Sequence, residues 1–326
     1  MNTDFILEKF KFEEDFKIPP VKNINAEAVI DIYEGMRDFF PSYQISLEPT
    51  TIAPKLDNIL DHFDALLLDA FGVINVGPEL VPGIISTLDK ARNKGITLLV
   101  VTNGASNNSF KKLAQLSSLG LEFSDNEIIS SRDAAEIFLT LNKPEGPMGI
   151  LGNIGNSFEI PNLHCIELEQ DYSMFNEMKS FVFLGTLHWD PLWQEILFNS
   201  LKDYPRPLFV ANPDLVAPHQ NKFSIEPAYY VSLLIKNGVH LPFWFGKPFS
   251  TIFEIAVNRI NELSGRYVPL SRIGMVGDTL HTDILGANSF GLKSILMTKY
   301  GLLRDSNIGE MIKKTNIIPD YIVEGP

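Results

Sequence analysis

Three charged side chains in this sequence have the types and the settings that phosphoryl transfer requires. Asp69, Lys247 and Asp278 each follow a short apolar run within two residues. A carboxylate at a strand end can attack phosphorus if a cation screens the repulsion between the two anions. Asp69 and Asp278 could hold such a cation, and Lys247 could neutralise both the nucleophile and the incoming phosphate. We expect the cation to be Mg²⁺, which takes oxygen ligands and retains several waters.

A second group of polar residues stands at the end of another apolar run. Thr102, Asn103 and Gly104 follow residues 96–101. Their side chains and neighbouring backbone N–H groups could bind phosphate oxygens. An isolated polar residue at a strand end is often only a turn or a helix cap. The matching settings of Asp69, Lys247 and Asp278 favour a functional interpretation here.

The elements that must position these side chains can be inferred from the apolar runs themselves. The runs show no alternation of apolar and polar residues, and helix-like segments follow them, which predicts strands covered on both faces in a parallel α/β sheet. Because ligands bind outside the carboxyl ends of such strands, the polar residues should converge at one edge. The runs are 65–68, 96–101, 243–245 and 273–276, and the helical segments are 81–93, 107–119, 251–263 and 282–289.

The spacing of these runs predicts more than one domain. The stretch between the second and third runs is far longer than one crossover helix needs, so we expect an inserted α/β domain at 129–240 and a Rossmann-like core at 50–128 and 241–326. Residues 1–49 form an N-terminal extension, which we interpret as an appendage to the main body. Residues 26–40 within it could form a helix with one apolar face.

Composition restricts the function classes. The net charge of −13 disfavours binding to nucleic acid, whose phosphate backbone it would repel. No apolar run approaches the roughly 20 residues of a membrane span, and the first residues lack the pattern of a secretory signal. The single cysteine permits no intrachain disulfide, which fits a reducing compartment. We therefore expect a cytoplasmic protein that binds neither nucleic acid nor a membrane.

The ordered set of motifs resembles the haloacid dehalogenase (HAD) superfamily of phosphotransfer enzymes. The order and spacing are similar to its class IIA branch, which includes sugar-phosphate and nitrophenyl phosphate phosphatases. The long insertion would then be a C2-type cap, and the resemblance covers roughly residues 60 to 305. The segments that carry it are Asp-Ala-Phe-Gly-Val at 69–73, Val-Thr-Asn-Gly at 101–104, Gly-Lys-Pro at 246–248 and Gly-Asp-Thr-Leu-His-Thr-Asp-Ile-Leu-Gly-Ala at 277–287.

The resemblance implies roles around a metal ion. Asp69 would be the nucleophile that forms an aspartyl-phosphate, and Asp278 would bind Mg²⁺. Asp283 would support the metal shell or pair with Lys247. The backbone carbonyl of Phe71 would be a third protein ligand to the metal.

The resemblance also implies residues that bind the substrate, a small phosphorylated metabolite. Thr102, Asn103 and Gly104, together with the lysine, would bind its phosphate. Asn212 and Asp214, in a segment that also resembles class IIA, would approach the rest of the substrate. The alternative for this Asn-Pro-Asp segment is an ordinary turn. Class IIA relatives often pair through their caps, so a homodimer is expected.

One position departs from the family pattern. The phosphatases of the family carry a second aspartate two residues after the nucleophile, which protonates the leaving group and activates water. Here that residue is Phe71, and such proton transfer is typically worth about 10²- to 10⁴-fold. Hydrolysis should then be slow, unless His281 beside the metal motif substitutes. The alternatives are a catalytically impaired protein that binds and senses a phosphometabolite, or other chemistry at the same nucleophile.

Overall fold

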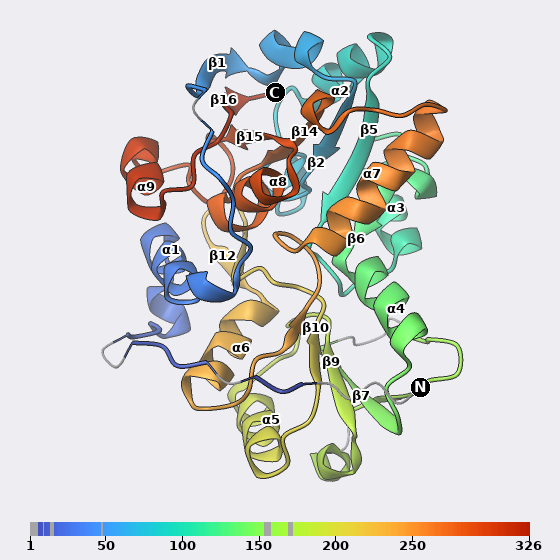
Figure 1. Cartoon of the computed structure of the whole chain (residues 1–326), viewed down its shortest axis with the longest axis vertical. Helices are drawn as coiled ribbons and strands as arrows, with labels where there is room; N and C mark the ends of the chain where they lie inside the picture. Colours follow the sequence, from blue (N-terminus) through green and yellow to red (C-terminus); the bar gives the residue numbers. More distant parts are fainter. Residues whose placement is uncertain (1–5, 9, 14–15, 47, 153–157, 169–171) are drawn as a thin grey trace.

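The computed structural model describes residues 6–8, 10–13, 16–46, 48–152, 158–168 and 172–326. Its main body is a seven-stranded sheet with the order β1-β16-β15-β14-β2-β5-β6, in which every neighbouring pair is parallel (Figure 1). No described helix is both long and apolar enough to cross a lipid bilayer. The strands are β1 (Thr51–Lys55), β2 (Ala65–Leu68), β5 (Thr97–Thr102), β6 (Ile128–Ser130), β14 (Ile273–Gly277), β15 (Lys293–Met297) and β16 (Tyr321–Gly325).

Helices cover both faces of this main sheet, as the uninterrupted apolar runs require. Leu66 and Leu68 of β2 pack in the same cluster as Leu88 of helix α2 (Ile84–Asn93). Leu67 points to the other face, where it packs with Phe253 of helix α7 (Ser250–Ser264). The four helices expected from the sequence are present as α2 (Ile84–Asn93), α3 (Ser109–Ser118), α7 (Ser250–Ser264) and α8 (Leu285–Phe290), the last preceded by a π-helical turn at Leu280–Ile284.

A second parallel sheet, with the order β13-β10-β9-β7-β8, forms the inserted body. The α/β fold with a cap-like insertion is therefore confirmed. In Figure 1 this sheet lies below the main one, and α4 (Ser131–Asn142) connects β6 to β7. Its strands are β7 (Pro147–Leu151), β8 (His164–Glu167), β9 (Ser180–Phe183), β10 (Leu208–Val210) and β13 (Phe243–Trp244).

The position of β13 differs from the sequence-based expectation. The run 243–245 was expected in the main sheet, but β13 pairs with β10, with Phe209 opposite Phe243. That prediction is wrong because the aromatic side chains find their partners in the second body: the Phe209 and Phe243 ring centroids are 5.4 Å apart. The chain therefore reaches Lys247 directly from the cap sheet.

Two small hairpins lie between the sheets, and two further helices belong to the cap (Figure 1). The hairpin β11 (Val216–Pro218)–β12 (Phe223–Ile225) meets the hairpin β3 (Asn75–Val76)–β4 (Glu79–Leu80), since the Gly77 N–H donates to the Pro218 carbonyl over 3.2 Å. The cap also carries α5 (Pro191–Asp203) and α6 (Pro227–Lys236).

The N-terminal helix packs on the core and is not an appendage. Helix α1 (Ala26–Gly35) begins at Asn25, whose side chain accepts the Ala28 N–H. Ile30 and Ile32 are fully buried, in a cluster that also contains residues of α8 and of α9 (Ile308–Thr315). Figure 1 shows α1 beside α9, at the level where the two sheets meet. The appendage interpretation fails because the apolar face of α1 covers the main body.

Candidate active site

The ends of neighbouring strands bring the acidic side chains together. β2 and β14 are adjacent and in register, and the Asp69 N–H donates to the Val276 carbonyl over 2.9 Å. Asp69 and Asp278 follow these two strands, and Asp283 lies in the π-helical turn after β14. Carboxylate oxygens of Asp69, Asp278 and Asp283 all lie within 4.8 Å of one another.

Lys247 joins two of these carboxylates. Its Nζ lies 2.6 Å from Oδ1 of Asp69 and 2.7 Å from Oδ1 of Asp283, and the lysine side chain is only 1% exposed. Burial alone would lower the pKa of Lys247, but the charges of Asp283, Asp69 and Asp214 more than offset this and raise the pKa above its ordinary value. The site therefore contains a permanent ammonium beside Asp69.

Backbone groups fix the two carboxylates that follow β14. Oδ2 of Asp283 accepts the N–H groups of Asp278 (3.2 Å) and Thr279 (3.1 Å). Asp278 accepts the Thr279 hydroxyl at Oδ1 (2.8 Å) and the Leu302 N–H at Oδ2 (2.6 Å). Both oxygens of Asp283 are thus occupied by partners within the protein.

The three carboxylates fit a divalent cation. They are balanced by a single ammonium, so negative charge is in excess. The pKa of Asp69 and that of Asp278 are both raised, first by burial and then by the neighbouring carboxylates. A Cβ added to Gly301 or Gly72 would lie 2.0 Å or 2.4 Å from Oδ2 of Asp278, so the backbone passes close to this oxygen. Mg²⁺ takes oxygen ligands, usually one or two carboxylates together with water, so the residues present fit this ion.

Asn103 connects the cap to the main body through its side chain. Its Oδ1 accepts the Lys247 N–H over 2.8 Å. Its Nδ2 donates to the Lys247 carbonyl (3.0 Å) and to Oδ1 of Asp214 (2.8 Å). The amide is therefore engaged within the protein. The neighbouring Gly104 N–H donates to the Thr102 hydroxyl oxygen over 3.1 Å, so of the expected phosphate-binding groups the Thr102 O–H still has a proton to donate.

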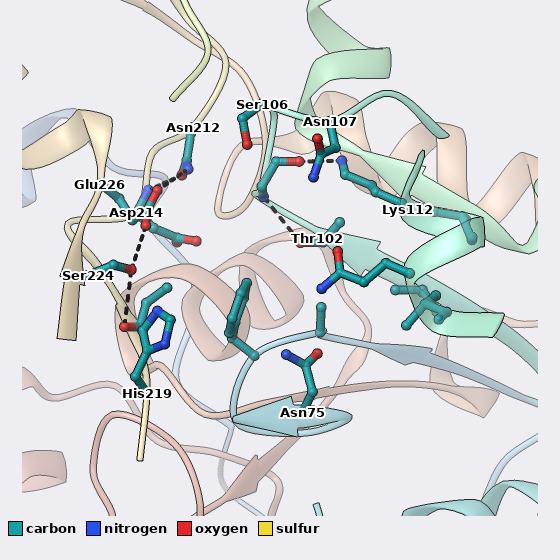
Figure 2. Close-up of a pocket in the computed structure, with 18 residues that line it drawn as sticks. Asn75, Thr102, Ser106, Asn107, Lys112, Asn212, Asp214, His219, Ser224 and Glu226 are labelled. Atoms are coloured by element: carbon teal, nitrogen blue, oxygen red, sulfur yellow. Dashed lines mark hydrogen bonds between the residues drawn. The ribbon is translucent and has the colours of Figure 1, made fainter. Parts of the chain in front are cut away.

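A cavity of about 290 Å³ opens beside these groups, between the main body and the cap. Figure 2 shows Asn212, Asp214, His219, Ser224 and Glu226 on one side and Thr102, Asn107 and Lys112 on the other. Four residues expected from the sequence to bind substrate, Asn212, Asp214, Thr102 and Gly104, all line this cavity. The other polar lining residues were not expected from the sequence; they are Asn75, Ser106, Asn107, Lys112, Gln115, His219, Ser224 and Glu226.

Most of the missed residues lie where the sequence has no repeating signal. Lys112 could have been found from the sequence. It lies one turn into α3, and the helix N-cap residue Asn108 comes shortly after the phosphate-binding candidates Thr102 to Gly104. His219 lies in the turn between β11 and β12, and Glu226 is the N-cap residue of helix α6. Only the folding of the inserted body brings these two toward the cavity.

Burial changes the acidity of the cavity residues. It raises the pKa of Glu226 to about 7, although hydrogen bonds from Ser224 and Asn212 act in the opposite direction. It also raises the pKa of Asp214 well above its ordinary value, with a further contribution from Asp69. It lowers the pKa of Lys112 to about 8. The cavity thus contains groups that can exchange protons near neutral pH.

Two positions bear on the missing proton donor. Phe71 lines the cavity, and its ring centroid is 6.1 Å from that of His219. His281 is fully buried elsewhere: its Nε2 lies 2.6 Å from Oε1 of Glu34 in α1, and its ring stacks on Tyr33 at 4.9 Å. The idea that His281 replaces the aspartate is therefore wrong, because α1 covers it.

Comparisons with known proteins agree on one family. Two family models match, "Haloacid dehalogenase-like hydrolase" at residues 66–162 and "HAD-hydrolase-like" at residues 244–325. Phosphoglycolate phosphatase 2 from Arabidopsis thaliana is 27% identical over 286 residues, covering 81% of this chain and 91% of that protein. A possible sugar phosphatase from Cytophaga hutchinsonii has a similar structure, with a TM-score of 0.75, 28% identity and coverage of 85% of this chain and 98% of that one.

A third similar protein was solved with a metal. The magnesium complex of a glycerol phosphate phosphatase from Mycobacterium tuberculosis has a TM-score of 0.63 at 23% identity, covering 81% of this chain and 75% of that one. At this identity the likeness concerns the fold alone. The two family-model matches here contain Asp69, Thr102, Lys247 and Asp278, and neither reaches α1.

Proposed function

Because this chain belongs to the haloacid dehalogenase-like hydrolases, in their class IIA phosphatase branch, we propose that it hydrolyses a small phosphorylated metabolite through a phospho-enzyme intermediate at Asp69. The observation that carries the proposal is the ammonium of Lys247 between Asp69 and Asp283, beside Asp278. An aspartate that only capped a helix would not need a buried cation and two further carboxylates around it.

The residues of the site have distinct tasks in this proposal. An oxygen of Asp69 attacks phosphorus, the bond to the leaving-group oxygen breaks, and water later hydrolyses the acyl-phosphate. Lys247 offsets the charge of both the carboxylate and the phosphate. Asp283 holds Lys247 and the start of the π-helical turn in place. The hydroxyl of Thr102 lies at the cavity wall, accepts the Gly104 N–H and can donate its own proton to a phosphate oxygen.

We propose that the site holds Mg²⁺, with Asp69, Asp278 and the Phe71 carbonyl as protein ligands. Asp283 would support these ligands without binding the ion directly. The cation would screen the repulsion between the nucleophile and the phosphate. Two observations support it: the excess of negative charge, and the glycines that let the backbone approach Asp278.

A second candidate function is a phosphometabolite sensor of the same fold. Phe71 favours it, because this residue lines the cavity and has no proton to give. Binding of metal and phosphate would be retained, whereas protonation of the leaving group and activation of water would have no side chain at this position.

The experiment that separates the two compares wild type with Asp69→Asn, using 4-nitrophenyl phosphate and Mg²⁺. We expect turnover in wild type and a loss of about 10⁴-fold or more in the variant, because an amide is not a nucleophile. Asp89→Asn, on an exposed position of α2, is the matched control and should keep full activity.

Two results would contradict the phosphatase proposal. One is turnover that persists in Asp69→Asn. The other is no turnover of any phosphate ester by wild type, together with a rise in melting temperature when phosphate and Mg²⁺ are added. The second result would support the sensor.

A further inference from the structure

The cap wall of the cavity carries a carboxylate whose surroundings suit a particular substrate. We propose that Glu226 selects the leaving group: it favours a neutral, hydroxylated leaving group and rejects one that carries a carboxylate. This inference rests on the proposed phosphatase function and adds the chemical class of the substrate to it.

Two side chains hold the Glu226 carboxylate in a fixed orientation. The Ser224 hydroxyl donates to Oε1 over 2.8 Å, and the Asn212 amide donates to Oε2 over 3.1 Å. The Glu226 N–H donates to the Leu215 carbonyl over 2.9 Å, which fixes its backbone as well. Figure 2 shows the three side chains together on the cap side of the cavity. Little side-chain entropy remains to be lost when a ligand binds.

Each Glu226 oxygen keeps a lone pair after these two bonds, because a carboxylate has about four acceptor sites. Two neighbouring hydroxyls of a polyol could therefore donate one hydrogen bond to each oxygen. Hydrogen bonds to a charged acceptor are among the strong ones in proteins. At a pH above the raised pKa of Glu226, where this side chain is charged, a carboxylate at the same place in the ligand would bring two like charges into contact in a partly buried site.

The other charged groups of the cavity do not reverse this preference. Asp214 adds a second acidic group on the cap side. Lys112 is the only lysine or arginine among the described lining residues, and it lies on the opposite wall, where its ammonium donates to the Gly104 carbonyl. The negative charges of Asp133 and Glu136 in α4 favour the protonated form of Lys112. A cationic ligand would meet Lys112, and an anionic one would meet Glu226, so a neutral ligand fits best.

The test is run at about pH 8.5, above the raised pKa of Glu226, and uses two substrates that differ only at the far end. In sn-glycerol 3-phosphate this end is a hydroxymethyl group, and in 3-phosphoglycerate it is a carboxylate. We expect the ratio of kcat/KM values to favour glycerol 3-phosphate by about 10- to 100-fold, the size expected for a hydrogen bond to a charged group. Glu226→Gln, which keeps the shape and removes the charge, should reduce that ratio at least about tenfold, mainly through KM.

Glu195→Gln is the matched control. Glu195 lies on the exposed side of cap helix α5 and does not line the cavity. This variant removes the same charge from the same domain and should leave the ratio unchanged. A wild type that uses 3-phosphoglycerate as well as glycerol 3-phosphate, or a ratio that Glu226→Gln does not move, would overturn the inference.

A binding measurement separates this inference from the phosphatase proposal. Calorimetry on the Mg²⁺-loaded Asp69→Asn protein gives the Kd of both compounds without turnover. If wild type hydrolyses no phosphate ester but glycerol 3-phosphate binds more tightly and Glu226→Gln removes the difference, the phosphatase proposal fails and the selection by Glu226 stands. If both bind equally, or neither binds, the inference fails whatever the enzymatic result.

Discussion

Phe71 places an apolar side chain among groups that suit phosphoryl transfer. Its ring lines the cavity where a proton donor would be useful. The consequence falls on the leaving group, since an alkoxide that receives no proton departs slowly. The backbone of residue 71 is unaffected by the side chain, so metal binding through its carbonyl remains compatible with phenylalanine.

This leads to a prediction for Phe71→Asp. The variant should hydrolyse an alkyl phosphate such as glycerol 3-phosphate about 10²- to 10⁴-fold faster than wild type, because it gains general acid–base catalysis. Steady-state kinetics with Mg²⁺ would measure it, and Phe71→Asn is the control of nearly equal size without an exchangeable carboxyl proton. Equal rates for all three proteins would mean that another cavity residue already supplies the proton.

Among the helices and strands, α1 has a role that its position in the sequence does not suggest. It contacts the main body through Glu34 and His281, and the cap through Tyr33. The Tyr33 hydroxyl accepts the Leu215 N–H (3.0 Å) and donates to the Pro213 carbonyl (3.4 Å). The segment preceding α1 continues the connection, as the Leu241 N–H donates to the Glu8 carbonyl over 2.6 Å.

Tyr33→Phe should therefore lower the free energy of unfolding by about 1–3 kcal/mol, because buried backbone groups lose their partner. It should also raise KM, since the two backbone groups flank Asp214 in the cavity wall. Urea denaturation and steady-state kinetics measure the two effects.

Tyr43→Phe is the matched control for this prediction. The Tyr43 hydroxyl makes the same pair of bonds, to the Asn316 carbonyl (3.1 Å) and from the Ile318 N–H (2.8 Å), but in the main body away from the cavity. It should affect stability without changing KM. A KM that rises equally in both variants would indicate a general loss of structure.

At the scale of the whole molecule, the two sheets enclose a site with excess negative charge. The pKa values of Asp69 and Asp278 are raised, so the folded protein binds protons more tightly than the unfolded chain. The stabilisation that comes from this tighter proton binding is fully present at low pH, below the ordinary pKa range of carboxyl groups. It is lost as the pH rises through the raised pKa values. Bound Mg²⁺ would replace the protons in compensating the charge.

We therefore expect the metal-free protein to melt at a lower temperature at about pH 8 than at about pH 5, and Mg²⁺ to raise the melting temperature more at the higher pH. Differential scanning calorimetry with and without EDTA measures both effects. Asp278→Asn should abolish the stabilisation by Mg²⁺, whereas Asp89→Asn should retain it. Stabilisation by Mg²⁺ that is the same in Asp278→Asn as in wild type would exclude this carboxylate as a ligand.

Much of the architecture followed from local patterns in the sequence. Uninterrupted apolar runs such as 65–68 predict strands covered on both faces, and parallel strands place the residues at their ends on one edge. This is why Asp69 and Asp278 could be paired although they are far apart along the chain. The long insertion likewise indicated a second body. Periodicity and strand polarity are properties of short segments, so they can be read without coordinates.

Tertiary structure alone decided the rest. The run 243–245 could have joined either sheet, and the aromatic neighbours that selected the cap are distant in sequence. The burial of His281 under α1 and the arrival of Glu226 at the cavity depend on how whole elements pack. The partners of a side chain across a domain boundary produce no periodicity in its own segment. For this reason the sequence indicated the sheet edge that carries the candidate site but not the cavity wall that faces it.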